Sequence, residues 1–272
     1  MPTNSRKPKG MMLVDDPRAT LKALCAFSGM TTDLYQYKKK YEEIINRIEK
    51  PVHIKHAHTH FYSLTGLGFL RPSVSKGIYE LSIEADRLCI SLKNSNIDEY
   101  QKILQYILLN NTYKGDLFKA FLNYLKQKPH FTREELFSEY KEIPAKTLIA
   151  WSLEAGFINS YKDNIWLVNR PEKKNLNINE FWGSLIDLYA KLSESEIFGI
   201  KRVFVDIRDL TFEFCTKYSW AIDEFDDMFK QLLNSEKGEK ITLYGAPTSY
   251  FEKKKNFIYN KRIYAFVRIM VN

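Results

Sequence analysis

The sequence predicts a mainly helical α+β chain in which short antiparallel hairpins separate groups of helices. Two observations predict this fold class. Apolar residues recur at helical spacing through much of the chain, for example at Tyr41, Ile44 and Ile48. A glycine that ends a helix, an aromatic-aliphatic pair, a polar loop and a short strand follow one another twice, in residues 64–82 and 152–169. Because the same succession occurs twice, we expect repeated modules.

The two copies read LTGLGFLRPSVSKGIYELS and SLEAGFINSYKDNIWLVN. Gly68 and Gly156 fit the position just after a helix, where glycine adopts a left-handed backbone at little steric cost. The apolar pair after each glycine then begins the first strand of a hairpin. A helix that runs through a glycine into a polar-tipped hairpin is typical of winged helix-turn-helix modules, so the sequence predicts tandem modules of that kind.

The first module is expected to span residues 17–95. Thr31 or Thr32 can cap its second helix, and Pro51 ends that helix because proline cannot continue it. The three helices predicted ahead of its hairpin span residues 17–29, 32–49 and 57–67.

The second module is expected to span residues 96–170 and to begin with a helix that ends near Leu109. Thr132 and Glu135 form a capping-box pattern, because a hydroxyl and a carboxylate three residues apart satisfy the free amides at a helix start reciprocally. Pro144 suits the first turn of a further helix. The helices predicted before its hairpin span residues 116–126, a short stretch after Thr132, and 144–155.

Residues 171–200 are expected to form a linker and a bridging helix, and residues 201–272 a C-terminal winged-helix-like module with a long basic hairpin loop. Asp206 and Ser219 are predicted to cap the two helices of this last module. Its repeat pattern is weaker, because no Gly-aromatic-aliphatic step ends its last helix. The strands of its hairpin are predicted at 241–244 and 263–270.

The charge balance indicates an anionic partner. The 272 residues include 41 lysines and arginines against 33 aspartates and glutamates, which gives a formal net charge of +8. Nucleic acid is the usual anionic partner of such a chain, although a lysine-rich composition can also serve solubility alone. Residues 1–16 are basic and polar and are expected to form a flexible arm.

The cysteines and the hydropathy predict a cytoplasmic protein without a membrane partner. Cys25, Cys89 and Cys215 lie far apart and form no CxxC pair. Such a sparse, odd set argues against a disulfide framework and points to a reducing compartment. No stretch of about 18 apolar residues predicts a membrane helix.

Four of the five histidines lie in the segment HIKHAHTH, residues 53–60. The segment resembles the opening HxH motif of polymerase-and-histidinol-phosphatase-type hydrolases. Such sites need further histidine and carboxylate ligands, and only His130 remains in the chain. We find no complete catalytic constellation, so the sequence predicts neither an enzyme, nor a cofactor, nor a bound metal. A metal held by three of these histidines stays open as an alternative.

In a winged helix the third helix enters the major groove and the hairpin meets the DNA backbone. Polar and basic residues near the starts of the third helices, in the hairpins and in the C-terminal loop are therefore the predicted DNA contacts. They are His56, His58, His60, Arg71, Lys76, Lys141, Lys146, Thr147, Lys162, Lys253, Lys254, Lys255, Lys261 and Arg262.

The steps LGFL…IYELSIEADRL and EAGFI…IWLV resemble tandem winged-helix DNA-binding proteins. Similar arrays occur in the recognition regions of restriction enzymes. The resemblance implies a sequence-specific double-stranded DNA-binding protein, such as a regulator, a replication or partition factor, or the specificity subunit of a defence system.

Two other functions are kept as alternatives. Winged helices also assemble with other proteins, and Tyr250, Phe251 and Phe257 could then anchor a partner subunit. The HxH segment leaves a metal-dependent hydrolase as the third hypothesis.

Overall fold

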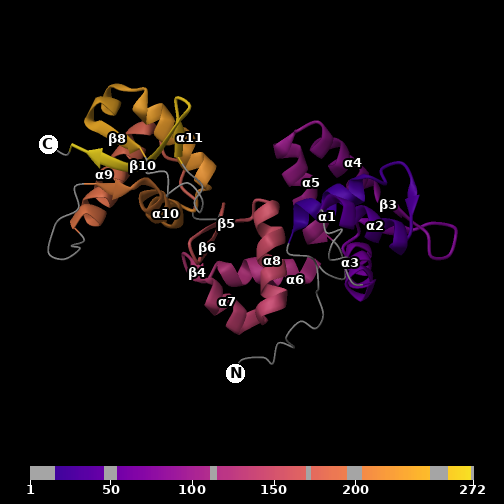
Figure 1. The fold of residues 1–272 in the computed structure, drawn as a ribbon. Coiled ribbons are helices and arrows are strands. Elements are labelled where there is room, and N and C mark those ends of the chain that lie inside the picture. Colours follow the sequence, from indigo (N-terminus) through magenta and orange to yellow (C-terminus); the bar gives the residue numbers. More distant parts are fainter. Residues whose placement is uncertain are drawn as a thin grey trace. The chain divides into compact units, whose positions relative to one another are not determined.

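The computed structural model describes residues 16–45, 54–110, 115–169, 173–194, 204–245 and 257–270 (Figure 1). These residues form an α+β structure with eleven α-helices and small antiparallel sheets, which confirms the predicted fold class at that level. The chain divides into two compact units. One comprises residues 1–127 and 131–158, and the other residues 128–130 and 159–272.

The first unit is mainly helical. Its helices are α1 (Pro17–Cys25), α2 (Leu34–Ile44), α3 (Ile54–Gly66), α4 (Ile83–Lys93), α5 (Ile97–Asn110), α6 (Gly115–Leu125), α7 (Arg133–Tyr140) and α8 (Glu142–Glu154). Its strands are β1 (Thr31–Thr32), β2 (Leu70–Pro72), β3 (Tyr79–Leu81) and β4 (Phe131–Thr132).

The hairpin predicted after Gly68 is confirmed. Gly68 has a φ of 80°, and the next amide, of Phe69, closes the end of α3 by donating to the carbonyl of Leu64 at 3.0 Å. Strand β3 lies between β2 and β1 in an antiparallel sheet, with Glu80 opposite both Arg71 and Thr31. The strand that precedes α2 in the sequence therefore joins the hairpin that follows α3.

The start predicted for α7 is confirmed, and the cap predicted for the start of α2 is wrong. The capping box of α7 is confirmed, because the Glu135 amide donates to the Thr132 hydroxyl at 3.2 Å and the Thr132 amide donates to the Glu135 carboxylate at 2.7 Å. The cap predicted for α2 is wrong. Asp33 caps α2 by accepting the amides of Tyr35 and Gln36, each at 2.8 Å, while Thr31 and Thr32 form β1.

A disulfide joins Cys25, at the end of α1, to Cys89 in α4. The sequence-based argument against a disulfide framework is therefore wrong for these two cysteines. Their Cα atoms lie 5.2 Å apart although 64 positions separate them in the sequence, because the packing of α1 on α4 brings them together. Cys215 is a free, buried thiol.

Replacing both Cys25 and Cys89 by serine is expected to lower the free energy of unfolding by about 2–4 kcal/mol, because the closed loop restricts the unfolded chain. Denaturant unfolding of oxidised protein measures the loss. A reductant should lower the stability of the wild type by a similar amount and leave the double variant unchanged. Equal midpoints for oxidised wild type and variant would contradict the expectation.

The described residues of the second unit form a hairpin, three α-helices and a larger sheet. The hairpin strands are β5 (Ile158–Tyr161), whose first residue belongs to the first unit, and β6 (Asn164–Leu167). The helices are α9 (Ile178–Glu194), α10 (Ile207–Tyr218) and α11 (Ile222–Leu233), with the 3₁₀-helix η1 (Glu236–Lys240). The sheet strands are β7 (Val205–Asp206), β8 (Ile241–Gly245), β9 (Phe257–Tyr259) and β10 (Arg262–Ile269).

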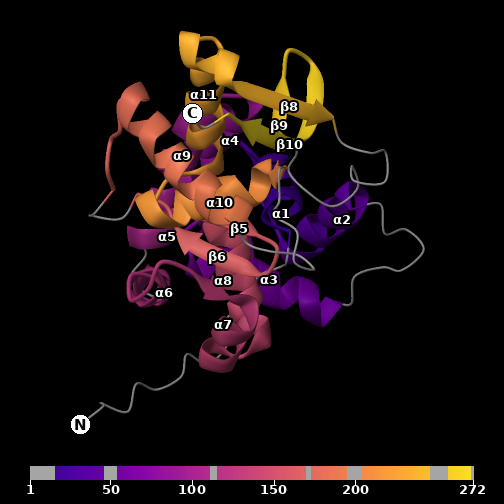
Figure 2. The same cartoon turned by 90° about the vertical axis from the view of Figure 1, so that its left-hand side faces the viewer.

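Strand β10 pairs with β7, β8 and β9, and Figure 2 shows β8, β9 and β10 side by side. An aromatic core holds α9, α10 and α11 together. Phe214 at its centre contacts Phe181, Trp220 and Phe225, with ring centroids 4.8–5.3 Å apart. The core also includes Phe257 of β9, which is fully buried, so this ring is not an exposed anchor for a partner as the assembly hypothesis supposed.

Of the two helix caps predicted in this unit, one is confirmed and one is wrong, and the expected long loop is shorter than predicted. Asp206 caps α10 as predicted, by accepting the amide of Arg208 at 2.8 Å. Ser219, however, closes α10 in a left-handed conformation with φ of 58°, and Ala221 precedes α11. Part of the expected long loop is also a hairpin, because Asn260 and Lys261 have positive φ and make a tight turn between β9 and β10.

Candidate nucleic-acid interface

Helix α3, the third helix of the first predicted module, has one buried face and one exposed face. Ala57, Phe61 and Leu64 are buried, and the Phe61 ring contacts Tyr37 of α2 at 5.6 Å between centroids. On the exposed face lie His58 and Tyr62, one turn apart. The sequence analysis placed a helix here, over residues 57–67, but did not predict which of its faces is buried.

We call His58, Tyr62 and Tyr79 the aromatic row. The centroids of the His58 and Tyr62 rings are 4.4 Å apart, and those of Tyr62 and Tyr79 are 6.3 Å apart. Tyr79, on β3, also meets the buried Phe61 edge-on at 5.0 Å. Partial burial and a hydrogen bond with Tyr62 raise the pKa of Tyr79. The row therefore carries rings from α3 to the loop end of the β2–β3 hairpin, where Tyr79 lies opposite Pro72.

The β2–β3 hairpin carries two of the predicted cations, of which Lys76 is exposed to solvent and Arg71 is paired with a carboxylate. Its loop is closed by backbone hydrogen bonds from Ser73 to Ile78 at 2.9 Å and from Ile78 to Ser75 at 3.1 Å. Lys76 is exposed in this loop. Arg71 instead forms a cross-strand ion pair with Glu80 at 2.9 Å, which reduces the positive charge that it presents.

The histidines of HIKHAHTH do not form one contact strip. His58 is exposed, whereas His60 is half-buried and meets Tyr41 edge-on at 5.9 Å. For His56 the structure describes the helical backbone only, and His53 lies outside the described residues. A helix turns His58 and His60 to different sides, unlike the strand end on which HxH hydrolases hold a metal. In the described parts of the chain, no three His, Cys, Asp or Glu side chains gather as metal ligands.

The predicted contacts around α8 differ in their accessibility. Lys141, at the junction of α7 and α8, is exposed and has a φ of 64°. Lys146 is exposed but pairs with Glu142 at 2.7 Å, and this contact lowers the pKa of Glu142. Thr147 is fully buried, so its prediction as a DNA contact is corrected: its side chain belongs to the core of the first unit and does not reach solvent.

The predicted contacts of the second unit also differ. Lys162, at the tip of the β5–β6 hairpin, pairs with Asp209 of α10 at 2.7 Å, and the Tyr161 hydroxyl donates to the same carboxylate at 2.9 Å. Lys261 and Arg262 are exposed at the β9–β10 turn. The three remaining predicted cations, Lys253, Lys254 and Lys255, lie outside the described residues.

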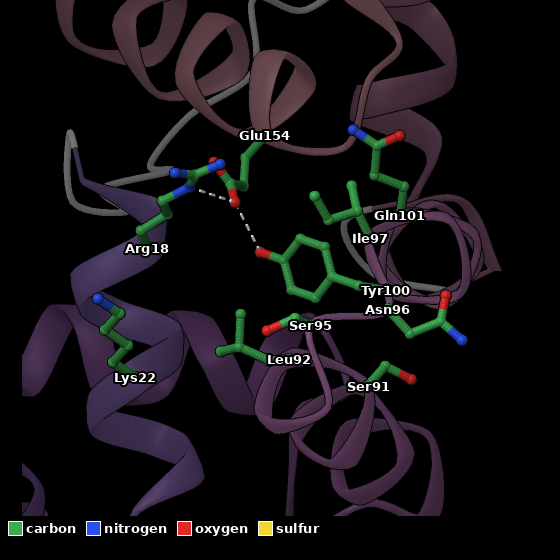
Figure 3. Close-up of a pocket in the computed structure, with 10 residues that line it drawn as sticks. All are labelled: Arg18, Lys22, Ser91, Leu92, Ser95, Asn96, Ile97, Tyr100, Gln101 and Glu154. Carbon is green, nitrogen blue, oxygen red and sulfur yellow. Dashed lines mark hydrogen bonds and ion pairs between the residues drawn. The ribbon is translucent and has the colours of Figure 1, made fainter.

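A pocket of about 150 Å³ in the first unit was not predicted (Figure 3). In it the Glu154 carboxylate accepts hydrogen bonds from the Arg18 guanidinium at 3.0 Å and from the Tyr100 hydroxyl at 2.8 Å. The three residues come from α1, α5 and the end of α8, and no local motif marks them. The other lining residues are Lys22, Ser91, Leu92, Ser95, Asn96, Ile97 and Gln101.

The contacts of Glu154 indicate a structural role for this network. Burial and the adjacent Glu154 carboxylate raise the pKa of Tyr100 far above its ordinary value, so the phenol stays protonated and donates. The Glu154 contacts raise the pKa of Arg18 as well. The network thus ties α1 and α5 to the end of α8.

Replacing Tyr100 by phenylalanine is expected to lower the free energy of unfolding by about 1.5–3 kcal/mol at pH 7, because a hydrogen bond to a charged group is lost. The raised pKa of Tyr100 adds stability below pH about 10, where unfolded tyrosine is protonated, and this contribution falls as the pH rises further. The difference between wild type and Tyr100→Phe should therefore shrink above pH about 10. Tyr106→Phe, which alters an exposed ring, is the control. A pH-independent difference would contradict this linkage.

No protein-family model, curated protein or solved structure matches the chain. Among the described residues, no helix has both the length and the apolar character needed to cross a membrane.

Proposed function

We propose that the chain is a sequence-specific double-stranded DNA-binding protein built from three winged helix-turn-helix modules. The observation that carries the proposal is a repeated order of elements: helix, strand, helix, helix, hairpin. The order occurs as α1-β1-α2-α3-β2-β3, as α6-β4-α7-α8-β5-β6 and, with η1 and β9 added, as α9-β7-α10-α11-β8-β10. The third repeat takes α9 as its first helix rather than as a bridge.

The strand pairing of the first and third repeats supports the proposal. In both, the last hairpin strand is central and pairs with the isolated early strand, in the orders β1-β3-β2 and β7-β10-β8. In a winged helix this pairing brings the hairpin beside the third helix, so that both can meet one duplex. The exposed face of α3 and the exposed Lys76 suit these two contacts in the first repeat.

Binding to a labelled random 30-base-pair duplex, followed by fluorescence anisotropy over a salt series, tests the proposal. Counterion release predicts a steep fall in affinity as salt rises. Single-stranded DNA and RNA of the same length are the comparison probes, and both should bind more weakly. If the protein does not bind duplex DNA at low salt, or if the affinity does not change with salt, the proposal is contradicted.

A protein–protein assembly subunit is the second candidate, and one observation favours it. Three of the predicted DNA-contacting cations, Arg71, Lys146 and Lys162, already pair with carboxylates. Purification with a stoichiometric partner that survives nuclease treatment would support this candidate over DNA binding.

A further inference from the structure

Ala57–Gly66, the stretch of α3 that follows Lys55 and His56, has a composition that restricts which bases it could read. From Ala57 to Gly66 the helix carries no arginine, lysine, asparagine or glutamine. These are the side chains that form bidentate hydrogen bonds with guanine or adenine in the major groove. The exposed groups of this stretch include the His58 imidazole and the Tyr62 ring, of which Tyr62 is 47% exposed.

Aromatic rings such as that of Tyr62 can pack against one apolar group on the base edges, the methyl group of thymine. The C5-methyl of thymine is the apolar feature of the major groove and is recognised by apolar contact. We infer that the aromatic row reads thymine by packing the Tyr62 ring, supported by His58, against thymine methyl groups. This inference rests on the proposed function and adds the class of base that the first module selects.

The surroundings of Tyr62 make it suitable for such contact. Its ring meets His58 at 4.4 Å, Phe61 at 5.9 Å and Tyr79 at 6.3 Å between centroids. Tyr79 is held in turn by the buried Phe61. A ring held on three sides loses little conformational freedom on binding, so that more of the contact energy appears as affinity.

The test begins by selecting binding sites from a random duplex library with the full-length protein. Each thymine of the selected site is then replaced singly by deoxyuridine, which lacks only the methyl group. At one or more positions the wild type should lose about fourfold in affinity for each methyl that it buries. Tyr62→Ala should bind thymine and deoxyuridine duplexes equally at those positions, whereas Tyr62→Phe, which keeps the ring, should still discriminate.

Tyr106→Ala is the matched control, because Tyr106 is 55% exposed on α5 and should leave discrimination unchanged. Circular dichroism of each variant checks that it is folded. If replacing each thymine by deoxyuridine leaves the affinity of the wild type unchanged, the inference is overturned while the proposed function stands. Discrimination that survives in folded Tyr62→Ala overturns it as well. Failure to bind any duplex overturns both the inference and the proposed function.

Discussion

Replacing Asp226 by alanine is expected to lower the free energy of unfolding by about 3–5 kcal/mol, because it removes the carboxylate that forms a bidentate pair with the buried Arg208 guanidinium. The two side chains form a bidentate pair with contacts of 2.6 and 2.9 Å between α10 and α11. Arg208 is 5% exposed and also lies 6.0 Å from the centroid of the Phe257 ring. Denaturant unfolding of the full chain measures the loss.

The double variant Arg208→Met/Asp226→Leu separates charge from packing. If the loss in Asp226→Ala comes from an uncompensated charge, replacing both partners by apolar side chains of similar size should restore most of the stability. A second control is Asp227→Ala, which removes a neighbouring carboxylate that is exposed and pairs with Lys230 at the surface. Equal losses in Asp226→Ala and Asp227→Ala would contradict the expected cost of the buried charge.

The parts of the fold that short-range patterns encode were predictable from the sequence. Gly68, with its left-handed backbone, and the reciprocal cap of Thr132 and Glu135 lie where the sequence placed them. These signals act over a few residues, so one sequence is sufficient to find them. Ser219 shows the limit of such signals, since a serine suits a helix start but here ends α10.

Features that join distant segments were not predictable in the same way. Cys25 and Cys89 pair across 64 positions, and Arg18 and Glu154 across 136. Neither pair has a local spacing that distinguishes it from unpaired residues. Only the packing of α1 against α4 and α8 brings their side chains into contact.

The candidate interface was predicted only in part, because its ion pairs also join residues that are distant in the sequence. Position near a helix start placed both His58 and Thr147 among the predicted contacts, but it does not show which way a side chain points: His58 is exposed, whereas Thr147 is buried in α8. The carboxylate partners of Arg71 and Lys162 lie 9 and 47 positions away, so the reduction of their charge was not visible in the sequence. A count of basic residues therefore overstates the positive charge of the predicted surface.

Reversing the charge of both Lys76 and Lys141 is expected to weaken duplex DNA binding about 100-fold at 0.1 M salt and to reduce the magnitude of the salt slope by about 2. These two residues are chosen because both are exposed, and neither pairs with a carboxylate among the described residues. Lys76 belongs to the β2–β3 hairpin and Lys141 to the start of α8, where the proposed modules meet phosphates.

The control must lose the same charge, because a lower net charge alone weakens attraction to DNA. Each Lys→Glu change removes one positive charge and adds one negative charge, so the double variant has a formal net charge of +4 instead of +8. Lys93→Glu/Lys102→Glu has the same net charge and alters exposed lysines of α4 and α5. It should change the affinity severalfold at most and keep the salt slope, because only direct phosphate contacts release condensed counterions. Equal weakening in both double variants would mean that DNA is attracted by overall charge, and not through the proposed hairpin and helix.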